Sequence, residues 1–191
     1  LLENHKFEEI QSLFWRNSKL NFNNPHTLIK SLDEKPDRKW LRKIQECEDE
    51  KALKFFLKDK NIESTQLNSN TLSLLWECCQ IPDFVKKTYG NHYEVIANVF
   101  KYLNSEKGKI NDDFMRLQLM KLDKLEGNVD SLSNRIANVR TWSYVSNKNN
   151  WIENQDYWIE KTKLLEDKLS DRLHEEFTKT FIDKRASVLA R

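Results

Sequence analysis

The apolar residues of this chain recur at intervals of three and four, the spacing that places side chains on one face of an α-helix. The longest such pattern runs near the C-terminus and keeps nearly one face for more than six turns. Its positions are Trp158, Thr162, Leu165, Leu169, Leu173, Phe177 and Phe181. The pattern predicts a long helix that begins at about Asp156.

A second regular pattern precedes it. Leu132, Ile136 and Val139 follow a strict alternation of four and three residues, which predicts a helix from Val129 to Ser146 that faces a partner helix. The polar run 147–150 is expected to connect the two helices, with Trp151 as an anchor.

Three shorter patterns fill the middle of the chain. After a polar loop over 64–70, Leu72, Leu75, Trp76 and Cys79 form a core-facing stripe, and Pro82 ends that helix because proline cannot continue it. The next two helices are predicted from Val95, Ile96, Val99, Phe100 and Leu103, and from Phe114, Leu117, Leu119 and Met120. Asp112 is the expected cap of the second, Gly108 lies in the loop before it, and Gly127 is expected near its C-terminal end.

The first third of the chain also predicts helices. An amphipathic helix is expected from Phe7 to about Asn17, and Asn24 before Pro25 is a good start for a short one. A further segment begins at Trp40, and Asp49 is expected to cap the next helix. The apolar positions are Phe7, Ile10, Leu13 and Phe14; Leu28, Ile29 and Leu32; Trp40, Leu41 and Ile44; and Leu53, Phe56 and Leu57. Since no segment alternates as a strand does, the prediction is an all-α, irregular multi-helix bundle with a long C-terminal helix.

Composition agrees with this prediction. Three glycines and three prolines leave little turn chemistry for a many-stranded sheet. The length of 191 residues allows one domain over 1–191, with 1–63 and 64–191 as the alternative subdivision. The first residue is Leu1 and the last helical pattern still runs at Arg191, so we expect a fragment of a larger chain.

Charge narrows the class of protein. The chain carries 32 basic and 30 acidic side chains, interleaved, for a net charge of +2, and no polybasic tail. No apolar run approaches the roughly 20 residues that span a bilayer, and no targeting segment is visible. Three cysteines make no even disulfide framework. We therefore expect a cytoplasmic protein without a membrane partner.

Two groups of side chains could carry chemistry of their own. Adjacent Cys78 and Cys79 point in different directions on a helix, so packing is favoured over a metal or redox site. The carboxylates and imidazole of Asp167, Asp171, His174 and Glu175 lie three or four residues apart, but cations surround them as on a solvated face. Neither a G-x-S-x-G elbow nor a glycine-rich phosphate loop is present. We predict no catalytic, cofactor-binding or metal-ligating residue, and no ATP hydrolysis by this segment alone.

A candidate binding surface lies in "NRIANVRTWSYV", residues 134 to 145. If Leu132, Ile136 and Val139 are buried, then Arg135, Asn138 and Trp142 share a neighbouring stripe, with Arg140 close by. Cations bind phosphates and flat rings stack on unpaired bases, so the stripe suits single-stranded RNA or DNA. Spacing alone favours the alternative, in which Trp142 belongs to the core and Arg135 pairs within the molecule.

Four stretches of the sequence resemble a known family. They are "FWRNSKLNF" (14–22), "LLWECCQIPDF" (74–84), "SLSNRIANVRTWSYVSN" (131–147) and "LEDKLSDRLHEEFTKTFIDKRASVL" (165–189). Together they resemble, in the same order and over nearly the whole chain, the helical C-terminal region of bacterial superfamily-two helicases related to the mitochondrial degradosome RNA helicase.

The resemblance implies a non-catalytic, all-helical accessory domain that follows two RecA-like motor domains, which would bind ATP and Mg²⁺ and pull the strand. It also implies that the helix from Val129 to Ser146 lies along single-stranded nucleic acid, with Arg135, Asn138, Arg140 and Trp142 as contacts. The alternative is a helical scaffold for protein–protein interaction. Its long last helix would dock on the motor domains or on a ribonuclease, through an apolar strip at Leu165, Leu169, Leu173 and Phe177.

Overall fold

The computed structural model describes residues 13–58, 67–86 and 89–189, and most of these residues are helical. The prediction of an all-α, multi-helix fold with a long C-terminal helix is confirmed. The chain divides into two compact units, unit 1 over Leu1–Cys79 and unit 2 over Gln80–Arg191. The division falls after the helix at 69–79, whereas the alternative subdivision of the sequence grouped that helix with the later ones.

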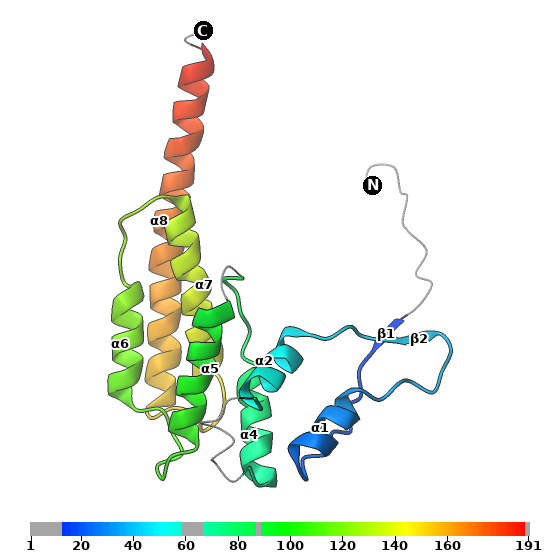
Figure 1. The fold of residues 1–191 in the computed structure, drawn as a ribbon. Helices are drawn as coiled ribbons and strands as arrows, with labels where there is room; N and C mark the ends of the chain where they lie inside the picture. Colours follow the sequence, from blue (N-terminus) through cyan, green and yellow to red (C-terminus); the bar gives the residue numbers. More distant parts are fainter. Residues whose placement is uncertain (1–12, 59–66, 87–88, 190–191) are drawn as a thin grey trace. The chain divides into compact units, whose positions relative to one another are not determined.

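Among its described residues, unit 1 contains three helices and two short strands (Figure 1). Its elements are β1 (Leu13–Trp15), α1 (Pro25–Leu32), β2 (Leu41–Lys43), α2 (Glu48–Phe56) and α4 (Ser69–Cys79). The strands pair in parallel, with Leu13 opposite Leu41. The helix predicted at Leu13–Phe14 is therefore wrong, and the segment predicted to begin at Trp40 contains the strand at Leu41–Lys43. Phe7 and Ile10 lie outside the described residues. A strand of three residues is too short to show alternation, and it forms by pairing with a distant segment, which local spacing does not reveal.

The helices of unit 1 begin where their caps allow. Asn24 and Thr27 form a reciprocal capping box at the start of α1, as the Asn-Pro pair predicts. The cap of α2 is Cys47 rather than Asp49, because Asp49 lies in the first turn and its carboxylate binds Arg16 instead. In α4 the predicted stripe is buried together with Cys78.

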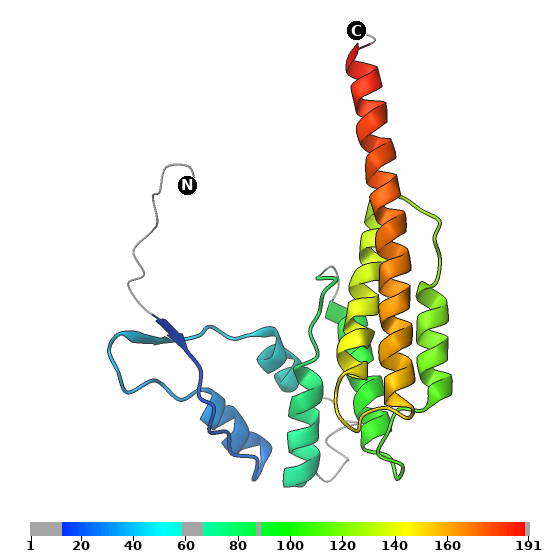
Figure 2. The ribbon, with the colours of Figure 1, turned by 180° about the vertical axis from the view of Figure 1, so that it is seen from behind.

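The part of unit 2 that the structure describes contains four helices, each of which a pattern of apolar residues predicted. They are α5 (Tyr89–Leu103), α6 (Asp112–Leu122), α7 (Val129–Ser146) and α8 (Gln155–Leu189). α7 has the predicted bounds and packs along α8, with α6 beside both (Figures 1 and 2). The buried side chains of α7 include Leu132, Ile136 and Val139, as expected.

α8 is covered along its first half only. Trp158, Thr162, Leu165 and Leu169 are buried, as the apolar pattern predicts. Beyond them α8 extends past the ends of α6 and α7 (Figures 1 and 2), and Phe177 and Phe181 are 42% and 67% exposed. The pattern therefore continues after its covering helices have ended.

α6 differs from its predicted form. Its N-cap is Asn111, and the carboxylate of Asp112 accepts hydrogen bonds from Trp158 Nε1 at 2.7 Å and from Asn154 at 2.6 Å, which join the starts of α6 and α8. Met115 is buried, whereas Leu117 and Met120 are exposed. Gly127, with φ +119°, lies in the connection to α7 rather than at the cap, which is Asp123. None of the described helices is long and apolar enough to cross a bilayer.

Candidate nucleic-acid interface

α7 carries all four residues that the sequence predicts to bind nucleic acid. Its N-cap Asn128 accepts a hydrogen bond from Ser131 N at 3.0 Å, and Asn147 donates to Ser143 O at its C-terminal end. Both ends of the helix are thus capped. The caps therefore define where α7 begins and ends.

Trp142 does not lie on the surface. Its side chain is 5% exposed, and its ring meets the edge of Phe114 at 5.7 Å in a cluster that includes Tyr102. Aromatic pairs of this geometry stabilise a core. The expectation of a free indole for base stacking is therefore wrong, and the core alternative for Trp142 is correct, because α5 and α6 cover this side of α7.

Asn138 lies beside a small cavity. Its side-chain amide donates to Asn134 O at 2.8 Å, which keeps it along the helix. Asn138, Thr141 and Trp142 line a cavity of about 60 Å³ together with residues of the 83–95 segment. Ligand pockets span roughly 300 to 1,000 Å³, so no nucleobase fits there.

Arg135 holds the connection between α6 and α7. One guanidinium nitrogen donates to Lys124 O at 2.8 Å and to Glu126 O. Gly127 lies next to this contact, and an added Cβ there would come within 3.0 Å of the Ser131 side chain. Arg135 thus binds within the molecule, to carbonyl oxygens rather than to a carboxylate.

Arg140 is the most open of the four residues. Its side chain is 54% exposed, and Nε donates to Glu166 Oε1 of α8 at 2.8 Å. An ion pair of this exposure contributes little stability, so a phosphate could replace the carboxylate. Arg140 is therefore the predicted contact that geometry leaves accessible.

Arg140 belongs to a row of side chains that the sequence analysis did not predict, although the spacing of residues 140–148 indicates it. Tyr144 follows it by four residues and shares its face of α7, and Lys148 lies just beyond the end of that helix. Lys148 Nζ lies 5.3 Å from the Tyr144 ring centre and 5.5 Å from that of Trp151. We call Arg140, Tyr144 and Lys148 the α7 stripe. Its phenol ring lies beside the Lys148 cation and about one helical turn from Arg140.

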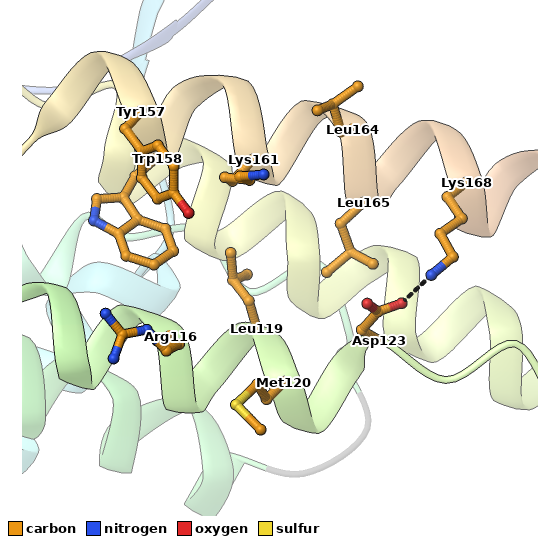
Figure 3. Close-up of a pocket in the computed structure, with 10 residues that line it drawn as sticks. All are labelled: Arg116, Leu119, Met120, Asp123, Tyr157, Trp158, Lys161, Leu164, Leu165 and Lys168. Carbon is orange, nitrogen blue, oxygen red and sulfur yellow. Dashed lines mark hydrogen bonds and ion pairs between the residues drawn. The ribbon is translucent and has the colours of Figure 1, made fainter.

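A second arrangement was not predicted at all. Arg116 of α6 and Tyr157, Lys161 and Lys168 of α8 line a groove between the two helices (Figure 3). The solvated face predicted on α8 concerned Asp167, Asp171, His174 and Glu175, which do not line this groove. The spacing of Tyr157, Lys161 and Lys168 was the available indication, because it places them along one line of the helix.

The other candidate groups, the two adjacent cysteines and the acidic cluster of α8, form no enclosed reactive site among the described residues. Cys78 and Cys79 are buried, and burial raises the pKa of the Cys79 thiol far above its ordinary value, so it stays protonated and unreactive. Asp167, Asp171, His174 and Glu175 are all exposed, and Arg172 pairs with Glu175 and Glu176. Among the described residues, no three His, Cys, Asp or Glu side chains gather where they could hold a metal ion.

Comparisons of the chain with protein-family models, with curated proteins and with solved structures find no match. The interpretation of function therefore depends on the residues themselves, on their resemblance to the helicase region and on the geometry of α7 and α8.

Proposed function

We propose that this chain is the non-catalytic C-terminal accessory domain of an ATP-dependent RNA helicase, where it guides single-stranded nucleic acid beside the motor domains. ATP and Mg²⁺ would be held by those motor domains. The observation that carries the proposal is the resemblance of residues 131–147 and 165–189 to the helicase region.

The geometry supports this proposal in one respect. The two stretches with the longest resemblance form most of α7 and the second part of α8, and α7 and α8 pack side by side within unit 2. A strand that follows α7 would meet the α7 stripe, with phosphates near Arg140 and Lys148 and a base against Tyr144. Arg135 and Asn138 would contribute indirectly, by fixing α7 and the connection before it.

The test measures binding of the intact chain to a fluorescent single-stranded oligouridylate at several salt concentrations. Each phosphate contact contributes about 0.7 to the slope of log affinity against log salt for single strands. The double variant Arg140→Ala, Lys148→Ala should therefore lower the slope by about 1.4. The matched control replaces Lys107 and Lys121, two exposed lysines that are not on α7 or α8, with alanine. An equal loss in the control would contradict the stripe, and absence of binding by the unaltered chain would contradict the function.

A change of opposite sign tests the same contact. Glu166 competes with phosphate for Arg140, so Glu166→Gln should raise the affinity for the oligonucleotide. Asp167→Asn is the control, because Asp167 is an exposed carboxylate next to Glu166 on the same helix. Equal gains in both variants would mean that only net charge matters.

One observation favours a second function, the helical interaction scaffold. Phe177, Phe181 and Ile182 are exposed on the part of α8 that extends past its covering helices. Of the predicted apolar strip, Leu165 and Leu169 are buried, Leu173 is half-buried and Phe177 is open. Sedimentation of the chain with and without the oligonucleotide separates the functions. Self-association abolished by Phe181→Ser, without nucleic-acid binding, supports the scaffold.

A further inference from the structure

The groove between α6 and α8 has an apolar floor. Leu119 of α6 and Leu165 of α8 face each other across it (Figure 3), and Trp158 closes one end. These three side chains are largely buried, whereas Met120 is 64% exposed and Tyr157 and Leu164 are about half exposed. The groove encloses about 390 Å³, within the range of binding pockets. It therefore offers room and apolar contact that no described element fills.

Cations surround this floor. Arg116 lies on the α6 side, and Lys161 and Lys168 lie on the α8 side about two turns apart. Arg116 pairs with Asp113 and Lys168 with Asp123, both through exposed side chains that solvent screens. Lys161 lies 5.3 Å from the Tyr157 ring centre and has no carboxylate within ion-pair distance among the described residues. Among the described residues that line the groove, three are basic and one, Asp123, is acidic, so the lining carries a net positive charge.

We propose that this groove binds an acidic amphipathic helix of a partner protein. Leu, Ile or Phe side chains of that helix, spaced at three and four residues, would rest on Leu119, Leu165 and Met120. Glutamates or aspartates on its flanks would meet Lys161, Arg116 and Lys168. The proposal does not rest on the proposed nucleic-acid function, since the α7 stripe and this groove share no residue.

The groove suits a peptide better than a nucleic acid strand. A bound single strand needs several exposed rings for its bases, and among the described groove residues only Tyr157 presents one. The exposed apolar side chains Met120 and Leu164 would make no favourable contact with phosphates. They gain from contact with apolar side chains, which leave water when the partner helix docks.

The experiment uses a designed helical peptide of about 15 residues, long enough to populate a helix. One version has leucines on one face and glutamates on both flanks, and the other has lysines in place of the glutamates. Fluorescence anisotropy measures their affinity for the intact chain. We expect the acidic peptide to bind and the basic peptide to bind at least tenfold more weakly. Lys161→Glu and Met120→Asp should each weaken the acidic peptide about tenfold, while circular dichroism shows an unchanged fold.

Lys163→Glu is the matched control, because Lys163 is exposed on the same helix but does not line the groove. Its effect should stay within twofold. Equal binding of both peptides, an equal effect of Lys163→Glu, or no binding of the acidic peptide would each overturn the proposal. Two further results would also overturn it. One is that Lys161→Glu abolishes binding of an oligouridylate but not of the acidic peptide. The other is that the chain self-associates and Met120→Asp abolishes that self-association.

Discussion

Trp76 of unit 1 and Trp142 of unit 2 are both 5% exposed, yet their surroundings differ. Trp142 meets Phe114 in an aromatic cluster. Trp76 has the Arg16 guanidinium 5.0 Å from its ring centre, and Arg16 also binds Asp49 through two hydrogen bonds of 2.8 and 3.0 Å. Trp142 of unit 2 thus packs against aromatic rings, whereas Trp76 of unit 1 packs against a cation that is itself paired with carboxylates.

The charged groups of unit 1 are incompletely satisfied. Glu50 is buried, and its Oε1 lies 3.2 Å from Arg16 Nη2 in a geometry that makes no hydrogen bond. Arg16 Nε also has no partner. Buried ions cost desolvation free energy that attraction offsets only when hydrogen bonds are good. Polar contacts therefore join the short elements of unit 1. The strength of these contacts depends on pH and on the presence of each charged side chain in the cluster.

The largest expected effect is in unit 2. Trp142→Ala removes a buried ring between α5, α6 and α7, and replacing large aromatic residues in cores costs about 3 to 5 kcal/mol of stability. Thermal unfolding followed by circular dichroism measures the loss. Trp142→Phe is the control, because it keeps a ring against Phe114 and should lose less. A loss below 1 kcal/mol would mean that the indole is not part of the core, and it would restore Trp142 as a surface contact.

A smaller loss is expected in unit 1. Arg16→Ala leaves Asp49 and buried Glu50 without their cation and uncovers Trp76. Breaking a buried pair costs 3 to 5 kcal/mol, but Arg16 is partly solvated, so we expect about 2 kcal/mol. Arg16→Lys keeps the charge but cannot make both hydrogen bonds to Asp49. Its stability should therefore lie between that of the unaltered chain and that of Arg16→Ala. Hydrogen exchange at the amides of α2 and α4 reports the loss within unit 1. Unchanged exchange would show that the cluster adds no stability.

The sequence predicts unit 2 better than unit 1 for a physical reason. α7 and the first half of α8 bury one continuous face, so their spacing determines both type and extent, and α7 was predicted at its exact bounds. β1 and β2 exist through pairing between segments far apart in the chain. Leu13 and Phe14 are exposed, so they bury no face that a local pattern could show.

The candidate site shows the same limit. Spacing placed Arg135, Asn138 and Trp142 on one side of α7, but it does not tell which helix covers that side. Coverage by α5 and α6 made Trp142 a core residue, and the connection after α6 took the hydrogen bonds of Arg135. Arg140 remains more than half exposed, and its ion pair is with Glu166 of α8. Whether a row of side chains on one helix is exposed depends on which other helices and connections pack against it, and local spacing does not show this.

The pH dependence of unit 1 tests its polar character further. Burial raises the pKa of Glu50, although Arg16 and Lys43 oppose the change. A raised pKa means that the folded state binds this proton more tightly, so Glu50 lowers stability as pH rises through the unfolded-state pKa toward the folded one. Glu50→Gln cannot titrate. Its stability relative to the unaltered chain should therefore rise as the pH increases from about 4, the ordinary glutamate pKa, through the raised pKa, by less than the loss in Arg16→Ala.

Asp33 provides the contrast within the same unit. A hydrogen bond from Lys43 lowers the pKa of Asp33, so its contribution is present above the ordinary pKa and is lost as pH falls through the lowered value. Asp33→Asn should therefore become relatively less stable than the unaltered chain as pH rises. The thermal midpoint of each variant is compared with that of the unaltered chain at the same pH. If both differences changed in the same direction with pH, burial would not be the main cause of the raised pKa of Glu50.

The smallest expected effect is a gain at the start of α2. Cys47 occupies the N-cap position without a side-chain hydrogen bond to the helix, and its thiol instead contacts Gln45 O at 3.4 Å. Burial and the nearby Asp49 carboxylate raise the pKa of this thiol, so it also carries no charge that could interact with the helix dipole. Serine is among the best N-cap residues, and Cys47→Ser should add about 0.5 to 1 kcal/mol to the stability of unit 1. Cys47→Ala is the control without a hydroxyl. Because the extra hydrogen bond would lie in α2, the gain should slow amide exchange in its first turn, while α7, which already has an asparagine cap, should not change.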